Sequence, residues 1–209
     1  MQENFPAVPT LQEEIDRSSV FGQKLEDLVV SRASVTLGQA GDRDKLLLAY
    51  WSLSHDYDKS ILALMREKFY GGAFALVRPL VEAEVRAHVV LMGSDDDLTK
   101  IKEDTYTVNF KTIGAQIDTA FDLQGFFDRF LNNARGALHS FTHSGLYQLG
   151  RRFRGNDLEA HYEDEDIIEV IHTSSTAVFM VTNLVTKHFK FVEEGKKVEE
   201  LFLEWGKKR

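Results

Sequence analysis

The chain contains no cysteine and only three prolines among its 209 residues. Without cysteine it has no disulfide, no thiolate nucleophile and no cysteine-ligated zinc site. Two of the prolines, Pro6 and Pro9, lie in the first nine residues, so the rest of the chain has almost no helix breakers. Those first nine residues lack the basic and apolar regions of a signal peptide, and no apolar run approaches the ~18 residues that span a bilayer. We therefore expect a cytoplasmic protein without a membrane partner.

Basic residues are also outnumbered by acidic residues, and the formal net charge is −8. A field of that sign discourages broad, sequence-independent binding to DNA or RNA, although it leaves room for one local basic site. The sequence has no phosphate-binding glycine loop, no nucleophile elbow and no Rossmann fingerprint. We expect no cofactor and no resident metal ion.

The apolar residues repeat at helical spacing over most of the chain. We predict an all-α fold, in which residues 1–9 form a flexible tail and residues 10–209 form a single helical bundle of about six to seven helices. Thr10 and Glu13 have the spacing of a capping box at the first helix, and Gly71 with Gly72 marks a later junction. The predicted helices cover residues 10–35, 43–68, 73–92, 94–121 with interruptions, 123–143, 163–191 and 196–205. Residues 146–163 are predicted to be a loop with short extended pieces.

Three charged residues lie at four-residue spacing on the very apolar helix 73–92. Arg78, Glu82 and Arg86 therefore share one side of that helix. Burying unpaired charge is costly, so these groups must be paired or partly wet. They form either a structural ion-pair ladder or one wall of a ligand site. Pro79 removes a backbone hydrogen bond beside Arg78 and predicts a kink there.

A second polar line follows on the helix 123–143. Arg135, His139 and His143 also repeat every four residues. Histidine suits proton transfer near neutral pH, and arginine suits phosphate or carboxylate. The three residues fit structural hydrogen bonding, a metal-free polar site or, through the two histidines, a metal site.

Single candidates lie outside these two lines. His55 falls in the middle of the helix 43–68, where a histidine either completes the core or contacts a ligand. Gln148, Arg151 and Arg152 lie in the segment after Gly145, next to an aromatic residue. Such arginines suit a phosphate group, or they pair in solution with the acidic residues Glu159, Glu163 and Asp164.

Three segments together resemble a bacterial family of uncharacterised all-helical proteins. They are FALVRPLVEAEVRAHVVL at 74–91, LHSFTHSGLYQLGRRFRG at 138–155 and YEDEDIIEVI at 162–171. They match the order of an RPxxEaxvR helix, a HsxTHgG…Q…RR segment and a Y.deeIie helix start, over roughly residues 40–190. Where the family pattern favours Gly-Gly after the second histidine, this chain has Ser144 and Gly145.

The wider similarity is to HEPN-type helical domains, several of which are metal-independent ribonucleases of toxin and defence systems. Those enzymes carry an arginine and a histidine separated by four to six residues. Here Arg135 has three residues before His139 and seven before His143, so neither pair has that spacing.

Three functions therefore remain open. In the first, a polar pocket built from the Arg/Glu/His residues binds an anionic small molecule or nucleotide. In the second, the protein is a metal-independent HEPN-like ribonuclease, or another nucleotide-directed enzyme. His139 or His143 would then act as acid or base, Arg78 or Arg135 would stabilise the phosphorane, and Glu82 would orient one of them. In the third, the polar lines only fix helix register in a structural protein. We also expect a homodimer, formed through residues 172–176 or 201–205.

Overall fold

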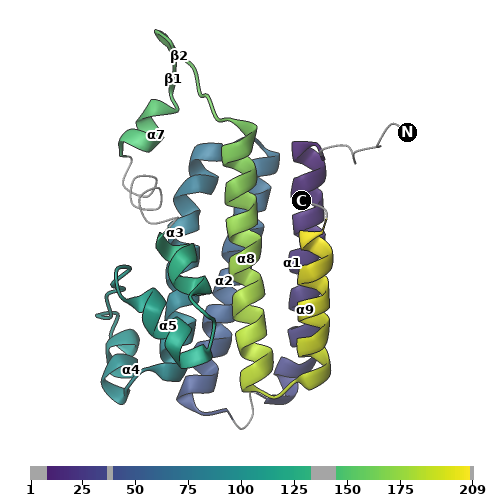
Figure 1. Ribbon diagram of the computed structural model, residues 1–209, viewed down its shortest axis with the longest axis vertical. Coiled ribbons are helices and arrows are strands. Elements are labelled where there is room, and N and C mark those ends of the chain that lie inside the picture. Colours follow the sequence, from purple (N-terminus) through teal and green to yellow (C-terminus); the bar gives the residue numbers. More distant parts are fainter. Residues whose placement is uncertain (1–8, 37–39, 133–144, 208–209) are drawn as a thin grey trace.

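Four long helices run side by side along the long axis of the molecule (Figure 1). The computed structural model describes residues 9–36, 40–132 and 145–207. The long helices are α1 (Leu11–Thr36), α2 (Asp42–Arg66), α3 (Tyr70–Met92) and α8 (Asp164–His188). Because α8 packs against α1, α2 and α3, it forms the centre of the bundle. The all-α prediction is confirmed.

Shorter elements cover the sides of this bundle. Helix α9 (Val192–Gly206) packs on α1 and α8, whereas α4 (Asp95–Lys102) and α5 (Ile113–Phe121) pack on α3. Residues 126–132 are helical as well. At one end of the molecule, α7 (Leu146–Gly150) leads into an exposed antiparallel hairpin of β1 (Phe153–Arg154) and β2 (Asp157–Leu158) (Figure 1).

The helix starts follow the capping signals in the sequence. The backbone N–H of Thr10 donates to the Glu13 carboxylate over 2.7 Å, and the Glu13 N–H donates back to the Thr10 hydroxyl over 3.3 Å. Ser94 and Asp97 form the same reciprocal pair at the start of α4. Both starts satisfy backbone N–H groups that the helix itself leaves unpaired.

Two boundaries differ from those predicted. The span 94–121 divides into α4 and α5, and the span 146–163 contains α7 as well as the short strands. The fifth predicted helix, 123–143, lies within the described residues only as far as 132. The number of helices is therefore not the predicted six to seven, because short helices that pack on α3 or precede the hairpin carry too little periodic pattern to be counted.

The junction between α2 and α3 is also built differently. Gly71 and Gly72 lie in the first turn of α3, and the chain turns at Lys68, whose φ is 60°. The N–H of Phe69 then donates to the carbonyl of Leu64 over 2.8 Å, which closes the end of α2. The left-handed residue is thus a lysine, although the sequence offers two glycines immediately after it. Helix α3 continues through Pro79 to Met92.

Helix α8 is the one described helix that is long and apolar enough to cross a membrane by length and composition. About two thirds of its most apolar stretch, 67%, is buried inside the bundle. Its apolar side chains therefore contact α1, α2 and α3, as expected of the core helix of a soluble protein.

Candidate functional site

Arg78, Glu82 and Arg86 form the ion-pair ladder that their spacing predicts. Nε of Arg78 donates to one carboxylate oxygen of Glu82 over 2.8 Å, and Nη1 of Arg86 donates to the other over 3.1 Å. All three side chains are partly exposed, at 23–24%. The three charged side chains therefore keep partial contact with water. This contact reduces the free-energy cost of placing charge on a helix whose remaining faces are buried.

Aromatic residues from two other elements border the ladder. The Arg78 guanidinium lies over the ring of Phe110, 5.6 Å from its centre. Burial raises the pKa of both Tyr50 and Tyr106, and the nearby charges of Asp104 and Asp97 add to the rise, whereas Arg86 lies close enough to both phenols to oppose it. Because burial raises these pKa values, both phenols keep their protons at neutral pH and remain hydrogen-bond donors.

The predicted arginine cluster after Gly145 separates into two environments. Arg151 is partly buried: its Nη2 lies 2.6 Å from Asp166, and its guanidinium lies 5.6 Å from the ring centre of Phe74. Because Phe74 precedes Arg78 by one helical turn, Arg151 lies near the N-terminal end of the ladder's side of α3. Arg152 is exposed. Gln148 belongs to α7, but its side chain is outside the described part of the structure.

Arg135, His139 and His143 lie outside the described residues. The meeting of Glu82 with either histidine therefore stays a prediction. What the structure does describe is the first part of that helix, residues 126–132, which contacts α3. The ring of Phe127 lies 4.9 Å from the ring of His88, and Phe127 is fully buried.

His55 lies far into the core rather than beside the ladder. It is 1% exposed, and its Nε2 lies 3.1 Å from the hydroxyl of Thr182, which also accepts the indole N–H of Trp51 over 3.2 Å. Burial lowers the pKa of His55 to about 4, so the ring is neutral. Its Nδ1 is buried without a hydrogen-bond partner among the described residues. His55 is therefore mainly a core residue that joins α2 to α8.

A buried carboxyl group, which the sequence analysis missed, lies one turn further along α2. Asp58 is 2% exposed and accepts the hydroxyl of Ser174 over 2.5 Å. Burial raises the pKa of Asp58 to about 7, while the hydrogen bond from Ser174 and the charge of Lys59 oppose the rise. A Cβ atom at Gly22 would lie 2.9 Å from its other oxygen, so only glycine lets α1 approach here. The sequence does contain a signal that Asp58 is buried. Asp58 lies four residues after Ser54 and four before Leu62, on the buried side of α2.

The same packing explains the small polar stretch in the middle of α8. Ser174 contacts Asp58 of α2, and His172 lies 2.8 Å from Glu14 of α1. His172 and Ser174 of the segment 172–176 thus serve contacts within the chain, as does Trp205, which stacks on Phe21. Both segments were predicted to supply a homodimer surface. The homodimer itself stays a prediction.

His88 and Glu84 are a second buried polar pair that the sequence analysis did not select. They lie one turn apart on α3, among its apolar residues. Within the part of the chain that the structure describes, no cluster of histidine, aspartate and glutamate has the arrangement of a metal site.

The comparison with family models matches residues 51–202 to a family of unknown function, DUF6988. This span includes α3, α8 and the whole ladder. The chain belongs to this family. Neither the curated proteins nor the solved structures gave a match. The likeness to HEPN-type domains therefore stays a prediction.

Proposed function

We propose that this member of DUF6988 binds an anionic small molecule, such as a nucleotide, at the Arg78–Glu82–Arg86 ladder. The observation that supports the proposal is that two arginines share one carboxylate. The three ladder residues together carry a charge of +1, against a net charge of −8 for the chain.

Arg86 is the centre of the proposed site. Within the described residues its only ion pair uses Nη1, on one edge of the guanidinium. Arginine carries five N–H donors in a planar fork, so the rest of that fork can meet a phosphate or carboxylate. Tyr50 and Tyr106, which keep their hydroxyl protons, supply further donors beside it.

The aromatic neighbours favour a nucleotide over a bare anion. The segment after α4 runs along the ladder, with Tyr106 near Arg86 and Phe110 at Arg78. Aromatic rings stack on bases, and arginine holds phosphate. We place this activity in the cytoplasm, where free nucleotides are held.

Isothermal titration with ATP and with pyrophosphate tests the proposal. We expect both to bind the wild type and Arg86→Gln to weaken both by about tenfold or more, since a charge-assisted hydrogen bond contributes ~1.5–3 kcal/mol. Glu82→Gln is the sharper variant, because it raises the local charge from +1 to +2. It should bind both anions more tightly than the wild type does.

The matched control is Arg66→Gln, which removes an arginine paired with Asp16 on the surface of α2. Its anion affinity should equal that of the wild type. Absence of binding by the wild type, or an Arg86→Gln variant as good as wild type, contradicts the proposal. Tighter binding of ATP than of pyrophosphate supports the nucleotide, whereas equal affinity restricts the site to the phosphate group. Cleavage of RNA in the same preparations would favour the ribonuclease instead.

A further inference from the structure

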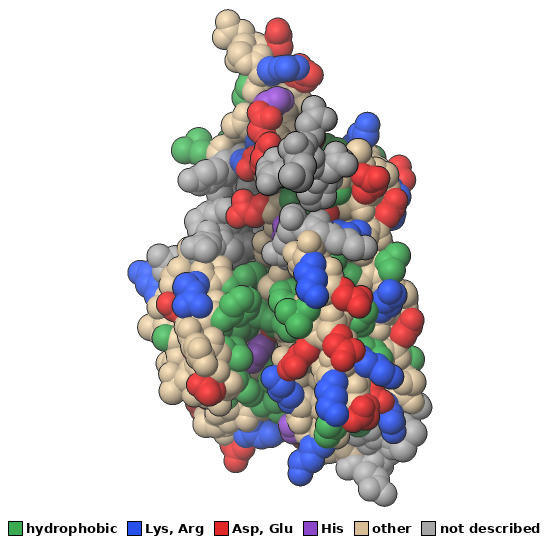
Figure 2. All heavy atoms as spheres, turned by 45° about the vertical axis from the view of Figure 1, so that its right-hand side comes forward, with side chains coloured by type: hydrophobic (Ala, Val, Ile, Leu, Met, Phe, Trp, Pro, Cys, Tyr) green, Lys and Arg blue, Asp and Glu red, His purple; other side chains and the backbone are tan. Residues whose placement is uncertain are grey.

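A cavity lies across α3 from the ladder. It has a volume of about 350 Å³ and lies between α3, the end of α5, the start of helix 126–132 and α8. Figure 2 shows hydrophobic side chains on both sides of a hollow on this face, with a histidine side chain between them. Most of the residues that line the cavity are apolar: Leu91, Phe121, Leu123, Phe126, Phe179, Met180 and Leu184.

His88 forms the polar part of the inner wall. The side chain is only 3% exposed, and its ring is held edge-on between Phe121 at 5.0 Å and Phe127 at 4.9 Å. Its Nδ1 lies 3.0 Å from the backbone carbonyl of Glu84. Its Nε2 makes no hydrogen bond with any described residue, although the ring borders the cavity.

The contacts of Nδ1 favour one tautomer of His88. Nδ1 lies 3.3 Å from a carboxyl oxygen of Glu84 but only 3.0 Å from the Glu84 carbonyl oxygen, which can only accept, so we assign the ring proton to Nδ1. Burial lowers the pKa of His88 to about 4, and the ring is therefore neutral at physiological pH. A neutral imidazole with its proton on Nδ1 presents Nε2 as an acceptor. Glu84 adds no charge, because burial raises the pKa of its carboxyl group well above the ordinary value.

A second unsatisfied acceptor comes from the opposite wall. Oδ1 of Asn183, on α8, is buried and has no hydrogen-bond partner among the described residues. Asn183 lines the same cavity as His88. Buried polar groups in proteins are nearly always paired, so the buried Oδ1 of Asn183 indicates a missing donor at this cavity, where Nε2 of His88 is also open to accept.

Two basic side chains at the rim already have acidic partners. Nε2 of His188 lies 2.7 Å from Asp44, and Nζ of Lys187 lies 3.7 Å from Glu199. An anionic group would therefore meet acceptors inside the cavity and basic side chains at its mouth that already contact carboxylates. This arrangement selects against carboxylates and phosphates.

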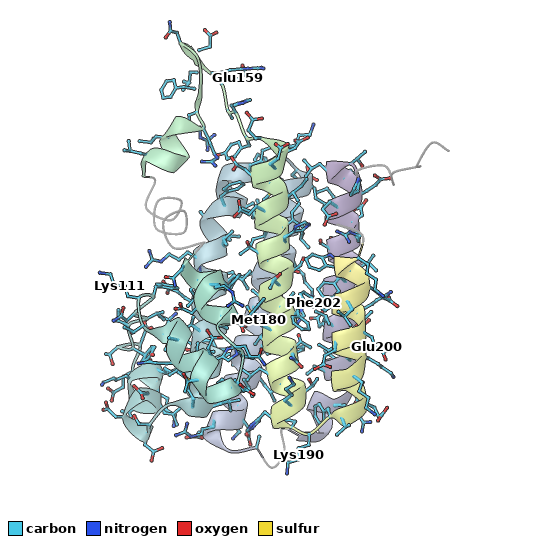
Figure 3. The ribbon with its side chains drawn as sticks, in the orientation of Figure 1. Lys111, Glu159, Met180, Lys190, Glu200 and Phe202 are labelled. Atoms are coloured by element: carbon cyan, nitrogen blue, oxygen red, sulfur yellow. The ribbon has the colours of Figure 1, made fainter. Side chains whose placement is uncertain are left out.

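We propose that this cavity binds a small, neutral, aromatic molecule that donates one hydrogen bond to Nε2 of His88, as an indole or a phenol does. The volume lies within the ~300–1,000 Å³ usual for small-molecule sites. The aromatic body contacts the phenylalanines and Met180, a flexible side chain that adapts to ring edges (Figure 3). The site is separate from the ladder and takes a ligand of opposite chemistry.

The first test needs only the wild-type protein and three probes: indole, 3-methylindole and 1-methylindole. The two methylindoles have the same size, but only 3-methylindole keeps the N–H. In isothermal titration we expect indole and 3-methylindole to bind about tenfold or more tightly than 1-methylindole, because the last leaves Nε2 unpaired. Equal affinity of the two methylindoles, or no binding by any probe, overturns the proposal.

Substitutions then test whether His88 accepts the hydrogen bond from the N–H of the ligand. His88→Phe keeps an aromatic ring and removes the acceptor, so 3-methylindole should fall to the affinity of 1-methylindole, which itself should not change. Met180→Trp fills the cavity and should abolish binding of all three probes while circular dichroism shows an intact helical fold. The control is His161→Phe, at a partly exposed position near the hairpin. An undiminished preference for 3-methylindole in His88→Phe would exclude His88 as the partner.

Discussion

At the scale of single residues, Asp58 is a group whose charge state depends on folding. In the unfolded chain it loses its proton near the ordinary value of 3.8, and in the folded protein near 7. Between these values the folded state holds a proton that the unfolded state has lost. The free energy of unfolding therefore falls as pH rises through this window, and the loss is complete above about 7.

Asp58→Asn should remove this pH dependence. The amide has the size of the protonated carboxyl group and keeps an oxygen for the Ser174 hydroxyl. Urea unfolding should show equal stability of variant and wild type at about pH 4, and a variant more stable by about 2 kcal/mol or more at about pH 8, since one pKa unit corresponds to ~1.4 kcal/mol. Asp56→Asn, two positions earlier and exposed, is the control. A constant difference between Asp58→Asn and wild type across this range would contradict the shifted pKa.

The buried histidines change the stability with pH in the opposite direction, over an overlapping pH range. Burial lowers the pKa of both His55 and His88 to about 4. Between about 4 and the ordinary 6.5, the unfolded chain binds protons that the folded protein excludes. Stability therefore falls as pH falls through that range. Comparing each Asp variant with wild type at the same pH removes this shared contribution.

At the scale of the elements, Asp118 fixes the helix that follows α5. Its two carboxylate oxygens accept the backbone N–H groups of Phe127 and Asp128, over 2.9 and 2.8 Å. These are N–H groups of the first turn, which have no partner within a helix. A side chain nine residues away in sequence thus caps helix 126–132 and holds Phe127 against His88.

Asp118→Ala should lower the free energy of unfolding by ~1–2 kcal/mol, the usual value of a helix cap. Asp118→Asn, which keeps one acceptor oxygen, should lose less. Hydrogen exchange should show the earliest loss of protection at Phe127 and Asp128. Unchanged protection at these two amides in the alanine variant would show that the carboxylate does not hold this helix.

The long helices were predictable from the sequence, and the short elements were not. Helices α1, α2, α3 and α8 carry repeating apolar faces over many turns, so their positions agree with the prediction to within a few residues. Helix α7 has five residues, too few for such a repeat. Likewise, the ladder depends only on spacing within α3, whereas the pairing of Asp58 with Ser174 depends on residues that are 116 positions apart.

The candidate site residues were likewise predictable only where they repeat within one helix. Polar groups were noticed when they repeated on one helix, as Arg78, Glu82 and Arg86 do. His88 was passed over because its significance lies in a missing partner and in a cavity made by three other segments. Those features come from tertiary packing, which a single sequence does not reveal.

At the scale of the whole molecule, α9 closes the bundle over a second, smaller core. Phe21, Leu25, Val178, Val198 and Trp205 form this core between α1, α8 and α9. Figure 3 shows Phe202 of α9 on the side facing α8, and its ring stacks on Phe179 at 3.8 Å. Trp205 also donates its indole N–H to Ser18 over 3.2 Å and lies beneath the guanidinium of Arg17.

Trp205→Ala should therefore destabilise the whole protein by ~3–5 kcal/mol, the usual cost of deleting a large buried aromatic side chain. Trp205→Phe should cost less, because it keeps an aromatic ring on Phe21 and loses the hydrogen bond to Ser18 and only part of the buried ring. Thermal unfolding followed by circular dichroism measures both. A change below about 1 kcal/mol in Trp205→Ala would show that α9 detaches without affecting the rest of the bundle.

Helix α3 carries its charged ladder and its neutral His88–Glu84 pair on nearly opposite sides. One helix therefore forms a wall of both proposed sites and is the element through which two bound ligands would influence one another. Any effect of an anion at Arg86 on the affinity of an aromatic molecule at His88 must be matched by an equal effect in the reverse direction, because free energies of binding are linked. The strength of that linkage would measure how rigidly α3 is held between α2 and α8.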